Sequence, residues 1–180
     1  MRRLFWMLAL SLCCGLLAPA FADNAAAPLQ VGQPAPAFRL QDQNSKWVTP
    51  ADFHGKYLVM YFYPKDFTGG CTTEVCTFRD DIAKLRKAGA AVVGVSLDDV
   101  KSHAAFAAKY HVPFPLLADS SHSVATSYGV LTAAGPVQYA KRTTFLIDPQ
   151  GKIAKIYVDV DPGKNSGQVM SDLAALKAAP

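Results

Sequence analysis

Cys71 and Cys76 are the residues of this 180-residue chain whose type and spacing point most directly to chemistry. An apolar run that ends at Tyr63-Pro64 precedes them, and a helix is predicted to begin at Cys71. A thiol at the start of a helix lies at the positive end of the helix dipole, which favours the thiolate, the nucleophilic form of cysteine. The pair therefore predicts sulfur chemistry.

Helical spacing determines what the two thiols can do together. Val75, Phe78 and Ile82 follow Cys71 at helical intervals, so Cys71 begins the buried face of the helix. Cys76 lies about 140° further around the axis, which puts the two Cα atoms about 8.7 Å apart, whereas a disulfide needs less than about 7 Å. The pair either stays reduced or unwinds the first turns when it oxidises. A permanent structural bridge conflicts with the helical period, and redox cycling is the better interpretation.

A metal site is another use of paired cysteines. Four-coordinate sites usually combine spacings of two to four residues with further cysteine or histidine ligands. The histidines of this chain are scattered, and we expect each to be a surface or loop residue: His54, His103, His111 and His122. No metal and no other cofactor is expected.

The first 22 residues have the features of a secretory signal peptide. Arg2-Arg3 is followed by an apolar stretch over residues 4–17 and by an Ala-x-Ala pattern that ends at Ala22. The stretch is shorter than the roughly 20 residues that span a bilayer, which disfavours an uncleaved membrane anchor. We expect cleavage after Ala22, while the arginine pair leaves a twin-arginine export route open.

The remaining chain is expected to form a flexible lead-in over residues 23–30 and one domain over residues 31–180. Cleavage would remove Cys13 and Cys14 and lower the formal net charge from +4 to +2, because the two arginines are the only charged residues lost. Such a charge gives no reason to expect nucleic acid or a membrane as a partner. Export predicts a periplasmic location, an oxidising compartment in which paired cysteines are usually structural.

Strands and helices alternate along the predicted domain. Strands are predicted at residues 57–63, 90–96, 116–118, 143–147 and 152–158, with a short hairpin formed by 38–40 and 47–49. Helices are predicted at residues 71–89, 101–110, 121–128 and 169–178. This order predicts an α/β domain in which helices flank a mixed central sheet.

The residues around the cysteines resemble those of a known family. The motif segments are Pro64-x-x-x-Thr68-x-x-Cys71, Thr-x-Glu74-x-Cys76-x-Phe78-Arg79-Asp80 and, downstream, Arg142-Thr-Thr-Phe-Leu-Ile-Asp148. They resemble the peroxiredoxins, and within them the bacterioferritin-comigratory-protein or Q-type group. The resemblance covers essentially the whole domain and implies a thioredoxin-like fold.

The resemblance implies a thiol peroxidase that serves antioxidant defence. Cys71 would be the peroxidatic residue, which attacks hydrogen peroxide or an organic hydroperoxide, releases water or an alcohol and becomes a sulfenic acid. Cys76 would resolve this species as an intramolecular disulfide, and a thioredoxin-like protein would reduce the disulfide. Because resolution stays within one chain, we expect a monomer.

The resemblance also implies supporting roles for four residues. Thr68 would hydrogen-bond the peroxide, Pro64 would shield the sulfur from water, Arg142 would hold positive charge beside it, and Glu74 would orient Arg142. From the residues alone, each has a plainer reading. Thr68 suits a helix cap, Pro64 a strand end, Arg142 an exposed surface charge and Glu74 a first-turn helix acid.

Gly69 departs from the resemblance, because the Q-type group usually has proline after the threonine. Two adjacent glycines, Gly69 and Gly70, are expected to loosen the loop before Cys71 and to affect the peroxidase rate, while Phe67 is a candidate for the pocket mouth. Two other classes share the predicted fold, thiol-disulfide oxidoreductases that act on proteins and copper-handling proteins. Both use a shorter cysteine spacing than this chain has.

Overall fold

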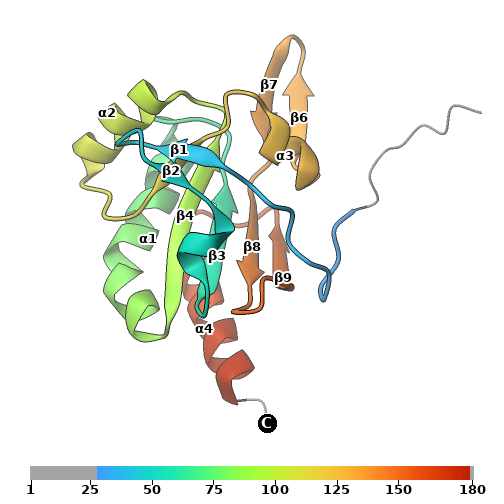
Figure 1. Cartoon of the computed structure of the whole chain (residues 1–180). Helices are drawn as coiled ribbons and strands as arrows, with labels where there is room; N and C mark the ends of the chain where they lie inside the picture. The colour runs from blue at the N-terminus through green and yellow to red at the C-terminus, as the bar shows by residue number, and fades with distance from the viewer. Residues whose placement is uncertain (1–27, 179–180) are drawn as a thin grey trace, which may run out of the picture.

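The computed structural model describes residues 28–178 (Figure 1). The predicted signal peptide and residues 23–27 of the predicted lead-in lie outside the described residues. The strands are β1 (Leu40–Asp42), β2 (Trp47–Val48), β3 (Tyr57–Phe62), β4 (Ala90–Ser96), β5 (Leu116–Ala118), β6 (Leu131–Ala134), β7 (Val137–Ala140), β8 (Thr143–Ile147) and β9 (Ile153–Val158). The helices are the 3₁₀ turn η1 (Pro50–Phe53), α1 (Gly69–Lys87), α2 (Val100–Tyr110), α3 (Ser123–Ser127) and α4 (Asn165–Ala178).

Seven strands form one mixed sheet in the order β2-β1-β5-β4-β3-β8-β9. The central strands β3, β4 and β5 are parallel, whereas β8 pairs with β3 in the antiparallel direction. The apolar run of β3 is buried on both faces of the sheet, as its composition predicts. The predicted α/β fold with a mixed sheet and flanking helices is therefore confirmed.

Each face of the sheet has its own apolar layer. On one face, Val59 and Tyr61 of β3 pack with buried residues of α1, α2 and α4. On the other face, Met60 and Phe62 pack with residues of α3 and with Phe38 of the N-terminal segment. Figure 1 shows α1 and α4 on one side of the sheet, away from α3 and the β6–β7 hairpin.

Helix α1 begins two residues earlier than predicted, at Gly69 instead of Cys71. Its N-cap is Thr68, whose backbone is extended (φ −80°, ψ 150°). The apolar period starts only at Cys71, and glycine is a weak helix former, so the pattern did not reveal the first turn. Gly69 and Gly70 therefore belong to the helix, and the prediction that they loosen a loop was wrong.

The exposed elements escaped the sequence pattern. The β6–β7 hairpin and η1 were not predicted, because few of their side chains are buried and no apolar alternation marks them. Helix α4 begins at Asn165 and not at the predicted Val169. Its first turn is polar yet buried, and it is held by tertiary hydrogen bonds such as the one that the Thr144 hydroxyl donates to Asn165 Oδ1 at 2.9 Å. Periodicity cannot report such contacts.

Candidate active site

Strand pairing brings the predicted site residues together. Phe62, at the end of β3, is paired with Thr143, the first residue of β8. Arg142 therefore lies beside the loop of residues 63–68, which leads from β3 into α1. The loop ends where α1 begins, and this places Cys71, the third residue of α1, next to Arg142. Residues that are 71 positions apart in the chain thus meet at one end of the sheet.

Cys71 is buried and contacts a cation. Its side chain faces the apolar layer beneath α1, and the residue is only 1% exposed. Arg142 Nη2 donates a hydrogen bond to the Cys71 sulfur at 3.2 Å. A guanidinium donor stabilises a sulfur that carries negative charge more than one that is protonated. The resemblance predicted positive charge from Arg142 beside Cys71, and the geometry agrees with it.

Gly70 makes room for this arginine. A Cβ atom at Gly70 would lie 3.2 Å from Arg142 Nη2, whereas a Cβ at Gly69 would meet nothing within 4 Å. Contacts as short as 3.2 Å are tighter than ordinary van der Waals packing, so the guanidinium would have to shift. The sequence reasoning missed this role, although a Gly-Gly pair next to a candidate nucleophile is a signal of close approach.

Glu74 holds the other side of the guanidinium. Arg142 Nη1 donates to Glu74 Oε2, and the glutamate is fully buried. Glu74 Oε1 has no hydrogen-bond partner among residues 28–178. Burial raises the pKa of Glu74 to about 7, although Arg142 acts in the opposite direction. Burial also opposes the charge of Arg142, but Glu74 and Cys71 outweigh it and raise the pKa of the guanidinium.

Thr68 and Pro64 lie in the loop that precedes Cys71. The Thr68 hydroxyl makes no capping hydrogen bond and donates instead to the Lys65 carbonyl oxygen at 3.0 Å. Thr68 is exposed and Pro64 is half-buried. Pro64 follows Tyr63, whose backbone N–H donates to the Val95 carbonyl at 3.1 Å, so the proline stands where pairing with β4 stops. Pro64 thus ends the strand as its type favours, whereas Thr68 occupies the N-cap position without a capping hydrogen bond from its side chain.

Cys76 lies further along α1 and is half-buried. It packs at the margin of the same apolar layer as Cys71, and both thiols are free. Helix α1 is intact between them, and in an intact helix this spacing holds the two Cα atoms too far apart for a direct disulfide.

One predicted surface histidine is buried. His103 of α2 is fully inaccessible and contacts Asp66, a buried residue of the loop that carries Pro64 and Thr68. The expectation of a surface or loop position was wrong because the apolar spacing of α2 was not used to place this residue. Asp66 and His103 are the ionisable residues of the site region that sequence reasoning missed.

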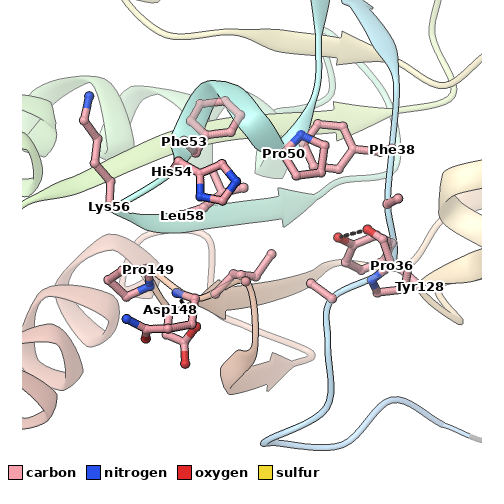
Figure 2. Close-up of a pocket in the computed structure, with 15 residues that line it drawn as sticks. Pro36, Phe38, Pro50, Phe53, His54, Lys56, Leu58, Tyr128, Asp148 and Pro149 are labelled. Carbon is pink, nitrogen blue, oxygen red and sulfur yellow. Dashed lines mark hydrogen bonds between the residues drawn. The ribbon is translucent and has the colours of Figure 1, made fainter.

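A separate pocket lies at the opposite end of β3. It has a volume of about 250 Å³ and contains none of the predicted site residues. Figure 2 shows Phe38, Pro50, Phe53 and Leu58 among its walls, with polar groups such as His54 also present. Its lining is predominantly apolar, and no candidate nucleophile is among its residues.

Within residues 28–178, no group of three or more His, Cys, Asp or Glu side chains is arranged to hold a metal ion. In the same residues, no helix combines the length and apolar character needed to cross a bilayer.

Comparisons with known proteins identify the family of this chain. The model of the AhpC/TSA family matches residues 31–156. The putative peroxiredoxin bcp of Coxiella burnetii is 40% identical over 149 residues, which cover 81% of this chain and 99% of the relative. The crystal structure of a mutant of Xylella fastidiosa PrxQ has a TM-score of 0.79 at 31% identity and covers 84% of this chain and 99% of its own.

A third comparison concerns the bacterioferritin comigratory protein of Xanthomonas campestris, whose trapped intermediate and ligand complexes were solved to explain its alkyl peroxide reduction activity. It has a TM-score of 0.75 at 33% identity and covers 82% of this chain and 96% of its own. A family model that spans most of the domain, together with these relatives, establishes the family. The chain therefore belongs to the AhpC/TSA family and is a peroxiredoxin of the Bcp and Q type, a thiol-dependent peroxidase.

Proposed function

We propose that this peroxiredoxin reduces hydrogen peroxide and organic hydroperoxides with Cys71 as the nucleophile and Cys76 as the resolving residue. The observation that carries the proposal is the hydrogen bond from Arg142 Nη2 to the Cys71 sulfur, with the buried Glu74 behind the guanidinium. This arrangement supplies fixed positive charge to a buried sulfur before any substrate arrives. Preorganised charge of this kind is usually the largest contribution to lowering a barrier in which charge moves.

The first chemical step is a displacement on oxygen. The Cys71 thiolate attacks the terminal oxygen of the hydroperoxide, so an S–O bond forms as the O–O bond breaks. The leaving hydroxide or alkoxide takes up a proton and departs as water or an alcohol, and Cys71 is left as a sulfenic acid. Arg142 donates a hydrogen bond to the Cys71 sulfur while the negative charge of the thiolate passes to the leaving oxygen. Thr68 would assist if its hydroxyl turned from the Lys65 carbonyl to the peroxide.

Pro64 supports the same step by its position. It is half-buried directly before Lys65 and Asp66, and it lines a surface hollow between this loop and the β6–β7 hairpin. A ring without an N–H would exclude water from the sulfur without offering a competing donor. We therefore keep for Pro64 the shielding role that the resemblance implies.

The second step joins the two sulfurs. The Cys76 thiol attacks the sulfenic sulfur, water leaves, and a Cys71–Cys76 disulfide forms. Because the two positions are about 8.7 Å apart in an intact helix, the first turns of α1 must unwind for the bond to close. A dithiol protein of the thioredoxin type then exchanges with the disulfide and restores both thiols. Each step conserves atoms and electrons without a metal or an organic cofactor.

We also propose that the protein works as a monomer outside the cytoplasm. The N-terminal features that predict a signal peptide support export to the periplasm. Export would require a reductant on that side of the membrane, since the disulfide needs two electrons for each turnover. Sequencing the N-terminus of the protein recovered from a periplasmic fraction tests export, and a start at Asp23 is the expected result.

Peroxide turnover tests the proposed function. Purified protein is supplied with hydrogen peroxide or an alkyl hydroperoxide and with a panel of exported and cytosolic thioredoxin-like reductants. We expect peroxide-dependent oxidation of at least one reductant, and its loss in Cys71→Ser. If the wild-type protein consumes no peroxide with any reductant and its reduced form does not react in a single turnover, the proposed function is wrong.

A further inference from the structure

The loop of residues 63–68 carries Pro64 and Thr68 but has no regular secondary structure. Within it, the Phe67 backbone has a positive φ of 61°, and its side chain is 46% exposed. A bulky residue in the left-handed region is a genuine outlier, because its Cβ crowds the backbone. Such a conformation persists only where surrounding contacts determine it. The loop therefore needs anchors outside itself.

Asp66 is the main anchor of this loop. Its side chain is 1% exposed. Oδ1 accepts a hydrogen bond from the Tyr63 hydroxyl at 2.7 Å, and Oδ2 accepts one from the Ser102 hydroxyl at 2.7 Å. Its backbone N–H donates to Asp98 Oδ2 at 2.9 Å. The Asp66 carboxylate thus accepts from Tyr63, the first residue of the loop, and from Ser102 of helix α2.

The ring of His103 completes the anchor. Its Nδ1 lies 2.9 Å from Asp66 Oδ2, and its Nε2 lies 3.2 Å from the Leu117 carbonyl oxygen in β5. A carbonyl oxygen can only accept, so Nε2 carries a proton. The Tyr63 hydroxyl, 3.4 Å from Nδ1, already donates to Asp66, so beside an ionised Asp66 the Nδ1 atom faces acceptors alone. This arrangement suits an imidazolium paired with a carboxylate.

The surroundings supply one countercharge to this imidazolium. The groups that face it are Asp66 and Tyr63 from the loop and the Leu117 carbonyl from β5. The nearby acids of the β4–α2 connection point elsewhere. Asp98 accepts from the backbone of Asp66, and Asp99 caps α2 through Ser102 N. A buried ion pair is tolerable when its remaining lone pairs and protons are satisfied, as they are here.

Helix α2 also contacts the next residue of the loop. The Phe106 ring, one turn after His103, meets the Phe67 ring edge-on at a centroid distance of 5.0 Å. The same face of α2 thus holds Asp66 by charge and Phe67 by packing. The contacts of His103 and Phe106 with the loop do not include Cys71, so any effect of α2 on the sulfur through these contacts must pass through the loop.

We propose that His103, as an imidazolium, is a positioning residue that fixes, through Asp66, the Pro64–Thr68 loop that leads into Cys71. The inference rests on the proposed function, because it assigns to this loop a part in the reaction of Cys71 with peroxide. Without the charged hydrogen bond, Asp66 loses one of its side-chain donors and the strained loop leaves its productive position. The Cys71–Arg142–Glu74 group stays intact.

Two isosteric variants separate loop positioning from packing. His103→Asn can keep a donor at the Nδ1 position toward Asp66, whereas His103→Gln can keep one at the Nε2 position toward Leu117. The measured quantity is the second-order rate constant for oxidation of the reduced protein by hydrogen peroxide. We expect a loss of about 10- to 100-fold in His103→Gln, the size of one hydrogen bond to a charged group, and a smaller loss in His103→Asn. The reverse order or equal losses would overturn the proposal.

The protonation of His103 is tested without any substrate. In nitrogen-15 NMR spectra of the reduced wild-type protein at neutral pH, both ring nitrogens are expected to carry protons. An unprotonated ring nitrogen would overturn the proposal. If His103→Gln does not fold, Ser102→Ala removes another donor to Asp66, and we expect it to lower the same rate constant several-fold. An unchanged rate in Ser102→Ala would then count against loop positioning.

These outcomes are distinguishable from failure of the proposed function. If the wild-type protein does not react with peroxide, the proposed function fails, while the ring protonation and the amide exchange of residues 65–68 in the His103 variants still test the anchor. If the wild-type protein reacts and the variants react equally fast, only the inference about His103 fails.

Discussion

The two ends of strand β3 are built on different principles. At the end near Phe62, the buried thiol of Cys71 contacts the guanidinium of Arg142, which also pairs with the buried Glu74. At the end near Leu58, a pocket of about 250 Å³ is open but lined mainly by apolar groups (Figure 2). The candidate site in this fold is therefore marked by buried charge beside a candidate nucleophile and not by the volume of a cavity.

The cost of burying charge explains why the two ends differ. A buried carboxylate or guanidinium is unfavourable unless it is paired, and Arg142 pairs with Glu74 while it also donates to Cys71. The pocket end carries its polar groups, such as His54 and Lys56, on exposed positions. Substitutions at the charged end should therefore change chemistry, whereas those at the pocket end should not.

The largest effect is expected from the nucleophile itself. Cys71→Ser replaces the sulfur with a far weaker nucleophile at the same place, so we expect the peroxidase rate to fall by at least about 10³-fold. Turnover with a reductant measures the loss. Gln150→Ala, at an exposed residue of the pocket, is the matched control and should keep the wild-type rate. A comparable loss in Gln150→Ala would erase the distinction between the two ends.

Loss of the guanidinium should come next in size. Arg142→Met removes the hydrogen bond to Cys71 Sγ together with the partner of Glu74. We expect the second-order rate constant with hydrogen peroxide to fall by about 10²- to 10³-fold, as when one preorganised donor is removed from an active site. Arg142→Lys should recover only part of the rate, because a point charge cannot serve both partners as a fork. Full activity in Arg142→Met would refute the role of this charge.

The adjacent glycines give a finer test of the same contact. A methyl group at Gly70 would crowd Arg142 Nη2, so Gly70→Ala should slow the reaction with peroxide about tenfold by displacing the guanidinium. Gly69→Ala is the matched control, because its methyl group meets nothing within 4 Å and alanine favours a helix. Single-turnover rates should therefore be lower in Gly70→Ala than in Gly69→Ala. Equal rates in the two variants would contradict the close-approach role of Gly70.

Gly69→Pro extends this comparison to stability. Gly69 is the first residue of α1, where proline is favoured because its missing N–H has no intrahelical partner, and the extended backbone of Thr68 suits a following proline. We expect thermal unfolding to show a gain of about 0.4–1 kcal/mol, from the reduced freedom of the unfolded chain. Destabilisation would show that the start of α1 does not have this conformation.

A separate test concerns the pH dependence of stability. Burial raises the pKa of Glu74 from 4.5 to about 7 in the folded protein. Between these values the folded state binds more protons than the unfolded state, so this group's contribution to the free energy of unfolding is complete below pH 4.5 and falls until the pH passes about 7. Denaturant titrations across that window should show a weaker fall in Glu74→Gln than in wild type. Gln150→Ala should keep the wild-type slope.

Much of the fold followed from local pattern. The continuous apolar run of β3, the helical spacing from Cys71 and the turn after Ile147 are all short-range signals that periodicity detects. The elements that escaped prediction depend on other forces. The exposed β6–β7 hairpin has no buried stripe, and the first turn of α4 depends on contacts with distant residues such as Thr144.

The candidate site divides in the same way. Its motif residues could be selected from spacing and from the family resemblance, and the structure brings Cys71, Arg142 and Glu74 together. Asp66 and His103 could not be selected, because their pairing depends on how α2 packs over the loop. Long-range packing of this kind leaves little trace in a single sequence, and a lone histidine is usually unremarkable.

The most direct test of the central claim is to locate the first oxidised sulfur. Cys76→Ser cannot form the intramolecular disulfide, so a sulfenic acid formed on Cys71 should persist long enough to be captured. The variant is mixed with one equivalent of hydrogen peroxide and a sulfenic-acid trap, and its peptides are analysed by mass spectrometry. We predict that the trap is found on Cys71. If Cys71 is recovered unmodified after treatment with peroxide and trap, Cys71 is not the sulfur that peroxide oxidises first.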